Sequence, residues 1–221
     1  MEESSILLQL KNVAWQAGAT QVLNNICFDL RAGEFKLITG PSGCGKSTLL
    51  KIIASLLSPT SGRLFFDNAD VATLSPERYR QQVSYCAQTP ALFGDTVYDN
   101  LIFPWQIRDK RPDPDVFLAD LARFELPETI LKKNINELSG GEKQRVSLIR
   151  NLQFLPRVLL LDEITSALDD SNKQNVNDII HGYATEKQVA VLWVTHDRNE
   201  ISHADGVISL QPAGGNMHEV R

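Results

Sequence analysis

The stretch EFKLITGPSGCGKSTLLKIIASLL, residues 34–57, joins an apolar run, a glycine-rich loop and a run of leucine and isoleucine at helical spacing. The loop matches the pattern GxxxxGK[ST] from Gly40 to Ser47. Its glycines let backbone N–H groups point to one side, and the start of the following helix adds a partial positive charge. The segment therefore predicts a strand, loop and helix that bind the phosphates of a nucleotide.

A glycine turn with only a structural role is the alternative, but two side chains of this loop would serve no purpose in such a turn. Lys46 can neutralise the terminal phosphates, and the hydroxyl of Ser47 can bind Mg²⁺. The predicted nucleotide-binding residues are Gly40, Pro41, Ser42, Gly43, Cys44, Gly45, Lys46, Ser47 and Thr48.

Two further apolar runs end in polar residues that can do chemistry. VLLLDE, residues 158–163, ends in Asp162 and Glu163. Asp162 would hold Mg²⁺ through its water shell, and Glu163 would orient or deprotonate the attacking water. VAVLWVTH, residues 189–196, ends in His196, a candidate contact for the γ-phosphate. The alternatives are two ordinary acids at an exposed strand end, and a structural or solvated histidine.

The run ELSGGEKQRVSLIRNL, residues 137–152, opens a helix with Ser139 and Glu142 as a capping box. Gly140 and Gly141 lie in its first turn, although each glycine costs a helix roughly 0.5–1 kcal/mol relative to alanine. We infer that some group needs a bare backbone there. An ordinary glycine turn is the alternative.

The order of the runs predicts an α/β fold. Continuous apolar runs at 34–40, 158–163, 189–195 and 206–210 alternate with helices, which is typical of a buried parallel sheet. Residues 5–31 predict an antiparallel hairpin, and 61–71 a short strand that pairs with it. We expect one domain over 1–221, with a catalytic core of 1–87 and 156–221 that includes the antiparallel β subdomain, and an inserted helical subdomain of 88–155.

Composition argues against several classes of protein. The net charge of −5 argues against a nucleic-acid partner, which would call for a basic surface. No apolar stretch approaches the roughly 18–20 residues that span a bilayer, and the acidic N-terminus lacks the basic region of a signal peptide. Cys27, Cys44 and Cys86 are too few and too scattered for a disulfide framework, and Cys27 and Cys86 are expected to be small apolar filler. We therefore expect a cytosolic protein.

Together these motifs resemble the ATP-binding subunits of ABC transporters over essentially the whole chain. GPSGCGKST resembles their Walker A loop, VLLLDE their Walker B strand and LSGGEKQR their signature, the most specific of these motifs. In this resemblance Gln88 is the Q-loop glutamine, SALD at 166–169 is the D-loop and His196 is the switch histidine. Trp15 stands where the family has an aromatic residue that stacks on adenine, with a packed strand aromatic as the alternative.

The resemblance implies a fold, a reaction and partners. The expected fold is a P-loop NTPase (RecA-like) core, and the expected cofactors are ATP and Mg²⁺, with Gln88 touching both the metal and the attacking water. Two subunits would pack head to tail, so that Ser139, Gly140 and Gly141 of one cap the γ-phosphate held by the other. This ATP-dependent homodimer would drive a separate multi-span membrane permease from the cytoplasmic face of the membrane.

The segment QTPALFGDTVYDNLIFPWQIR, residues 88–108, is unusually aromatic for a loop region. In the family this neighbourhood contacts the membrane subunits, so Phe93, Tyr98, Phe103 and Trp105 are candidates for that contact. Core packing is an alternative for Phe103 and Trp105. The sequences of this segment and of the Walker A region resemble those of the ATP-binding subunits of bacterial iron exporters, although no residue pattern indicates iron.

Two other classes of function remain open from the sequence. An ABC-type ATPase acting on nucleic acid or ribosomes would be expected to carry coiled-coil insertions, zinc modules or tandem units. A small-molecule kinase shares the phosphate loop but has no reason to carry LSGGEKQR.

Overall fold

The N-terminal sequence folds into two long antiparallel strands, β1 (Ile6–Ala17) and β2 (Thr20–Arg31), joined at Gly18 in a left-handed conformation (φ 60°). Strands β4 (Ser61–Phe66) and β5 (Ala69–Asp70) complete a four-stranded antiparallel sheet of order β2-β1-β4-β5. The predicted hairpin and its added strand are confirmed. Asn25, also left-handed, lies inside β2 at a shift in register, so it interrupts the pairing without ending the strand.

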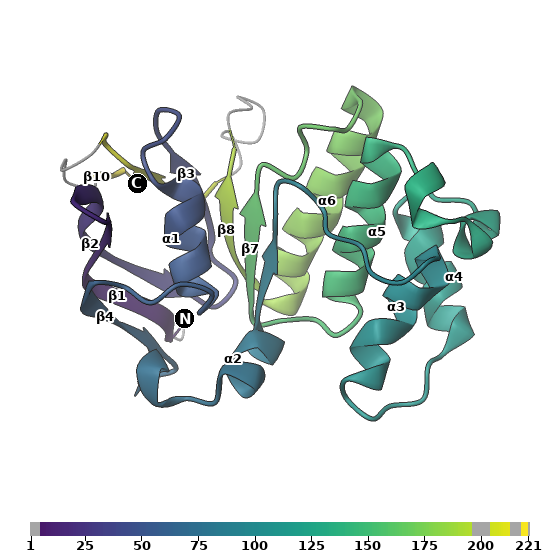
Figure 1. The fold of residues 1–221 in the computed structure, drawn as a ribbon, viewed down its shortest axis with the longest axis horizontal. Coiled ribbons are helices and arrows are strands. Elements are labelled where there is room, and N and C mark those ends of the chain that lie inside the picture. The colour runs from purple at the N-terminus through teal and green to yellow at the C-terminus, as the bar shows by residue number, and fades with distance from the viewer. Residues whose placement is uncertain (1–4, 196–203, 213–217, 221) are drawn as a thin grey trace. The chain divides into compact units, whose positions relative to one another are not determined.

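The four apolar runs form the centre of a second sheet, of order β10-β9-β3-β8-β7-β6 (Figure 1). Strands β3 (Phe35–Thr39), β7 (Val158–Asp162), β8 (Ala190–Val194) and β9 (Gly206–Ser209) run parallel, while β10 (His218–Val220) is antiparallel to β9. Strand β6 (Val83–Cys86) lies beside β7 at the edge. Every residue of β7 and β8 is buried, which explains why their sequences are apolar without alternation.

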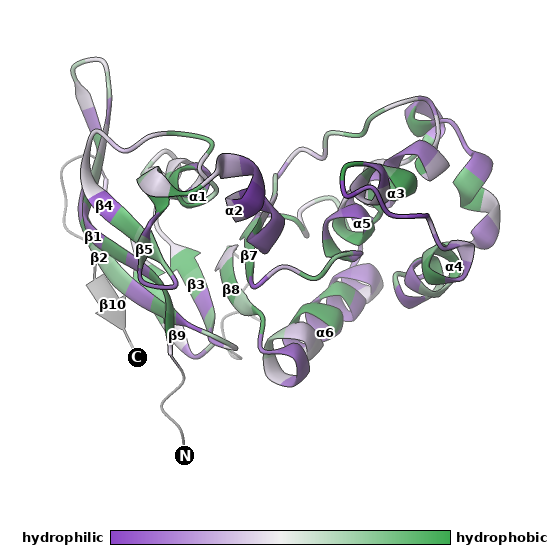
Figure 2. Ribbon diagram, turned by 90° about the horizontal axis from the view of Figure 1, so that it is seen from below, coloured by the Kyte–Doolittle hydropathy of each residue, from purple (hydrophilic) through white to green (hydrophobic). Residues whose placement is uncertain are grey.

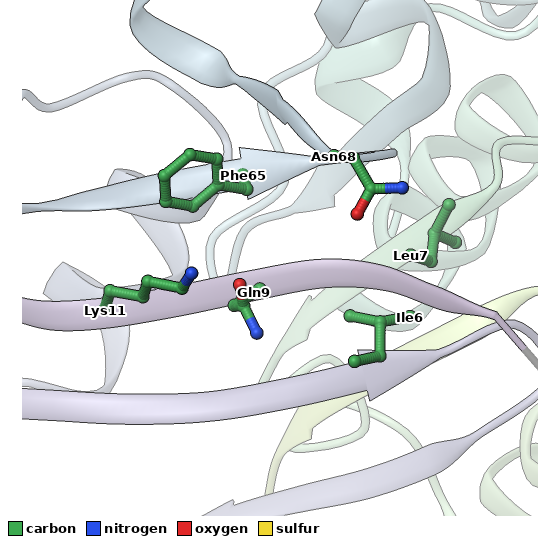
Figure 3. Close-up of a pocket in the computed structure, with 6 residues that line it drawn as sticks. All are labelled: Ile6, Leu7, Gln9, Lys11, Phe65 and Asn68. Carbon is green, nitrogen blue, oxygen red and sulfur yellow. The ribbon is translucent and has the colours of Figure 1, made fainter.

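Helix α1 (Lys46–Ile53) follows β3 and lies between the two sheets (Figure 1). Its four buried aliphatic residues join a hydrophobic cluster that contains residues of both sheets: Leu49, Leu50, Ile52 and Ile53. A short 3₁₀ turn (Val71–Thr73) and helix α2 (Pro76–Gln82) lead to β6. Most residues of α2 are exposed, and Figure 2 shows the helix as hydrophilic, whereas β3 is largely hydrophobic.

The middle of the chain is helical, as the sequence predicts. It contains α3 (Val97–Gln106), α4 (Pro114–Arg123), two 3₁₀ turns (Glu128–Lys132 and Ile135–Glu137) and α5 (Gly140–Leu152). Helix α6 (Asp170–Lys187) then leads to β8. Asp113 and Ser139 cap the N-termini of α4 and α5, so the segment LSGGE opens a helix as expected.

The structure describes residues 5–195, 204–212 and 218–220. The chain divides into two compact units, one of residues 1–85, 156–163 and 181–221 and the other of 86–155 and 164–180. The second unit is here called the helical unit. It includes residues 88–155, proposed above as the helical subdomain, together with residues 86–87 and 164–180, which were expected in the core. Among the described residues, no helix is long and apolar enough to cross a membrane.

Candidate functional site

The glycine-rich loop forms a cradle at the end of β3. Gly45 caps α1 in a left-handed conformation (φ 99°) and has no side chain to cover the helix N-terminus. A Cβ added there would lie 2.8 Å from Leu23 Cδ2. Gly40 is at φ 146°, and its Cβ would lie 2.5 Å from the carbonyl oxygen of Leu210. Only glycine fits at these two positions, and the backbone N–H groups of the first turn stay open to an anion.

Lys46 reaches back over the loop. Its side chain is almost fully buried, and Nζ donates hydrogen bonds to the carbonyl oxygens of Gly40 (2.8 Å) and Pro41 (3.1 Å). A buried ammonium is costly unless its N–H groups are paired. The two loop carbonyls pair these N–H groups, and phosphate oxygens held by the loop would be further partners for the ammonium.

Asp162 lies at the carboxyl end of β7 with only 3% of its surface exposed. One carboxylate oxygen accepts a hydrogen bond from the Ser47 hydroxyl (3.0 Å), and the other accepts one from the Tyr85 hydroxyl (2.8 Å). The structure thus brings Ser47 and Asp162 together, as the sequence predicts for a shared cation. A carboxylate and a hydroxyl are hard oxygen donors, so this pair fits Mg²⁺, which prefers such ligands.

Glu163 follows directly, at the point where the chain leaves β7. It has a left-handed backbone (φ 49°), which is uncommon for a residue other than glycine. Its backbone N–H donates to the carbonyl oxygen of Val194 (2.9 Å), the last residue of β8. Glu163 is partly exposed, whereas Asp162 before it and Ile164 after it are buried. A carboxylate in this position can accept a proton from water.

The signature segment begins α5 in the helical unit. The Ser139 hydroxyl accepts a hydrogen bond from the Glu142 N–H (3.2 Å), and a Glu142 carboxylate oxygen accepts one from the Ser139 N–H (2.7 Å). The predicted capping box is therefore present. Hydrogen bonding from the Ser139 backbone, the largest cause, lowers the pKa of Glu142, and Lys133 adds to the shift. Ser139 and Gly140 remain exposed at the helix N-terminus.

The two signature glycines have different surroundings. A Cβ on Gly141 would lie 3.2 Å from the carbonyl oxygen of Ala167 and 3.3 Å from Leu168 Cδ2. A Cβ on Gly140 would meet only Ala167 Cβ, at an ordinary 3.7 Å. Packing against the segment 166–169 thus accounts in part for Gly141, whereas nothing around Gly140 in the described structure requires glycine.

Trp15 lies on β1 opposite Leu23 of β2 and is partly buried against the hydrophobic cluster. Leu23 is the side chain that a Cβ on Gly45 would strike. The indole therefore belongs to a strand pair that touches the phosphate cradle. Both alternatives from the sequence, stacking on adenine and packing on the strand, remain compatible with this placement.

Two predicted residues cannot be placed against the cradle. Gln88 lies exposed two residues after β6 and belongs to the helical unit, so its contact with the metal stays a prediction. His196 lies outside the described residues, two positions after the end of β8. Cys86 is buried as expected, which raises the pKa of its thiol to about 12, but Cys27 is exposed and the filler interpretation was wrong for it.

Tyr85 was not among the site residues predicted from the sequence. The tyrosine hydroxyl in the run VSYC, residues 83–86, hints at a polar role, but the sequence does not reveal that β6 lies beside β7.

Fold and cradle together define a class of protein, and comparison with known proteins agrees. The family model described as ABC transporter matches residues 23–166. The chain belongs to this family and is the ATP-binding subunit of an ABC transporter, an ATPase that couples ATP hydrolysis to transport.

Among individual proteins, the chain is 73% identical to the probable iron export ATP-binding protein FetA of Escherichia coli, over all of this chain and 98% of that protein. It is 39% identical to the mycobactin import ATP-binding/permease protein IrtB of Mycolicibacterium thermoresistibile, over 92% of this chain but only 36% of that longer protein.

A solved structure confirms the fold class. The dimeric post-hydrolysis state of the ATP-binding cassette MJ0796, bound to ADP and Pi, superposes with a TM-score of 0.86 at 29% identity. The match covers 97% of this chain and 99% of that chain. The fold is therefore that of an ABC ATPase, with a mainly parallel core sheet, an antiparallel N-terminal sheet and a helical subdomain.

Proposed function

We propose that this chain binds and hydrolyses Mg²⁺-ATP to power the export of iron through a separate membrane permease. The observation that carries the chemistry is the cradle itself, with Lys46 held over the loop and Ser47 bonded to Asp162 at 3.0 Å. The cargo and the direction of transport rest on the 73% identity to a protein described as a probable iron exporter.

The hydrogen bonds of Lys46, Ser47 and Asp162 support the roles proposed for these three residues, and the remaining roles rest on the motifs. The backbone of residues 40–48 would hold the phosphates, and Lys46 would neutralise their charge. Ser47 and Asp162 would hold Mg²⁺, which when bound shields the phosphate charge during attack. Glu163 would orient the attacking water and take its proton. Gln88 and His196 complete the proposed set, at the metal and the γ-phosphate, and Trp15 would stack on adenine.

We further propose that two copies close head to tail on ATP. The N-terminus of α5 is exposed at Ser139 and Gly140, so an anion from a second molecule can reach its N–H groups. The related cassette MJ0796 is described as dimeric with ADP and Pi bound. ATP held by both copies would stabilise the closed dimer by mass action, and hydrolysis would release it.

The helical unit offers a surface for the permease. Five large hydrophobic residues of this unit are at least 38% exposed: Phe93, Tyr98, Phe103, Ile107 and Leu155. Phe93 and Phe103 contact each other with ring centroids 5.2 Å apart, and the guanidinium of Arg150 lies 4.4 Å from the Phe93 ring. Contiguous exposed apolar groups mark interaction sites, and the Phe93–Phe103 pair is such a group. We propose that this surface binds a multi-span permease and places the subunit on the cytoplasmic face of the membrane.

Trp105 is assigned to packing within the helical unit. Its ring centroid lies 4.9 Å from that of Phe154 and 6.0 Å from that of Phe117, and its indole N–H donates to Gln153 (3.2 Å). The packing alternative is therefore favoured for Trp105, while Phe103 stays in the proposed permease surface.

A deletion strain tests the cargo. Loss of the gene should raise sensitivity to iron above that to other metals and to drugs, and increase cell iron after a pulse of Fe²⁺. Wild-type protein should restore both, and Lys46→Ala should restore neither, since ATP binding is lost. Sensitivity to a different metal or drug would overturn the iron assignment.

Purification of the protein from membranes tests the partner. It should recover a multi-span membrane protein, and recovery of DNA or ribosomes instead would overturn the transport assignment.

A further inference from the structure

Asp162 is held by two hydroxyl groups, one on each carboxylate oxygen. Ser47 belongs to the phosphate cradle, and its bond to Oδ1 is expected in a cation site. The second bond, from the Tyr85 hydroxyl to Oδ2 at 2.8 Å, comes from outside the cradle. The established activity assigns no role to Tyr85.

Tyr85 reaches Asp162 because β6 lies next to β7 in the sheet. Its side chain is partly buried, whereas Asp162 is 3% exposed. Tyr85 is also the last residue of its unit before the chain enters the helical unit at Cys86. The hydroxyl therefore comes from the edge strand that leads directly to Gln88.

We propose that Tyr85 is a positioning residue for the Mg²⁺ site, an inference that rests on the proposed function. The terminal torsion of an aspartate is soft, so a carboxylate held on one side only can rotate. The Tyr85 bond fixes Oδ2 and keeps Oδ1 directed toward Ser47. Groups that orient a metal-binding carboxylate in this way are expected to strengthen metal binding without touching the metal.

A structural role is the competing explanation. A buried carboxylate needs hydrogen-bond donors whether or not it binds a metal, and Tyr85 could serve that need alone. The two explanations differ in one respect. A positioning role predicts a change in metal affinity that depends on Asp162, while a structural role predicts a change in stability alone.

The experiment compares Tyr85→Phe with Tyr79→Phe. The control residue is a buried tyrosine of the same unit, and its hydroxyl donates to the carbonyl oxygen of Ile53 (2.6 Å), away from the cradle. Mn²⁺ serves as the probe for the metal site, because its binding to the complex of the protein with a non-hydrolysable ATP analogue can be followed by electron paramagnetic resonance. Affinity for the analogue in EDTA measures nucleotide binding without metal.

Tyr85→Phe should weaken Mn²⁺ binding to the nucleotide complex by about tenfold, with the affinity in EDTA unchanged. Tyr79→Phe should alter neither quantity, although its thermal stability should fall. Equal Mn²⁺ affinity in Tyr85→Phe and wild-type protein would overturn the inference. A matching loss of analogue affinity in EDTA would also overturn it, since the tyrosine would then support the whole cradle.

A second arm tests whether Tyr85 acts through Asp162. In an Asp162→Asn background, adding Tyr85→Phe should cause no further loss of Mn²⁺ affinity, because the positioned carboxylate is already gone. A further loss of Mn²⁺ affinity in the double variant would show that Tyr85 affects metal binding independently of Asp162, and would overturn the inference. If wild-type protein binds no ATP analogue at all, the proposed function fails as well, so the two failures are distinguishable.

Discussion

At the scale of single residues, Gly140 and Gly141 show how one motif combines two requirements. Gly141 is confined by the backbone at Ala167, so a side chain there would push the segment 166–169 away from α5. Gly140 meets no such obstacle and is exposed. Its glycine costs helix stability without a packing reason in the described structure, which is consistent with a ligand that needs close access to the backbone.

Alanine substitutions should separate the two effects. Gly140→Ala should raise the free energy of unfolding by at most about 1 kcal/mol through helix propensity, since Gly140 is the first residue of α5 and the full difference applies to helix interiors. Gly141→Ala should have a lower free energy of unfolding than Gly140→Ala, because the added Cβ would lie 3.2 Å from the carbonyl oxygen of Ala167. Urea unfolding measures both.

The same variants test the role of the signature. Both should bind ATP as monomers with nearly wild-type affinity. Both should lose hydrolysis, because a methyl group at Gly140 or Gly141 hinders the approach of a phosphate from the second molecule to the backbone N–H groups. If ATP binding by the monomer falls while dimerisation persists, the signature acts within its own subunit and the head-to-tail arrangement is wrong.

At the scale of elements, carboxylates cap three helices that begin in the helical unit. Asp99 accepts from the Thr96 N–H at the start of α3 (2.8 Å), Glu142 caps α5, and Asp169 accepts from the Asn172 N–H at the start of α6 (3.0 Å). In each case a backbone hydrogen bond is the largest cause of a lowered pKa. The charged form is favoured at a helix N-terminus because backbone N–H groups and the helix dipole face it.

These caps predict a loss of stability in acid. A carboxyl whose pKa is lower in the folded state stabilises the fold above its unfolded value of about 4, and this contribution is lost as the pH falls through the lower native value. The melting temperature should therefore drop below pH 4, and Asp99→Asn should show a smaller drop. Asp178→Asn, on an exposed site in the middle of α6, is the control. An unchanged drop in Asp99→Asn would show that this cap does not contribute.

At the scale of the whole molecule, the proposed catalytic unit is larger than one chain. The described cradle contains the phosphate loop, the pair Ser47 and Asp162 proposed to hold Mg²⁺, and Glu163. The exposed N-terminus of α5 is the proposed second anion-binding group. A head-to-tail pair would give each ATP both elements. The nucleotide would then control assembly, and hydrolysis would control disassembly.

Glu163→Gln should trap this assembly. The amide keeps the size of the side chain but cannot take a proton from water, so ATP should bind and persist. Size-exclusion chromatography with Mg²⁺-ATP should show a dimer, and phosphate release should be lost. Glu163→Gln combined with Lys46→Ala is the control and should stay monomeric, because the phosphates are no longer bound. A single variant that remains monomeric with ATP, or hydrolyses it normally, would contradict the role of Glu163.

The sequence alone determined the central parallel strands, the N-terminal hairpin, the helices that follow the two glycine-containing motifs, and most of the proposed chemistry. Local patterns specify them: glycine spacing for the loop around Lys46, unbroken apolar runs for buried strands, and serine three residues before glutamate for the cap of α5. Only the tertiary structure decided which strands are neighbours, because pairing depends on packing between segments far apart in the chain. It placed Tyr85 against Asp162 across 77 positions, put Ala167 over Gly141, and left Cys27 exposed.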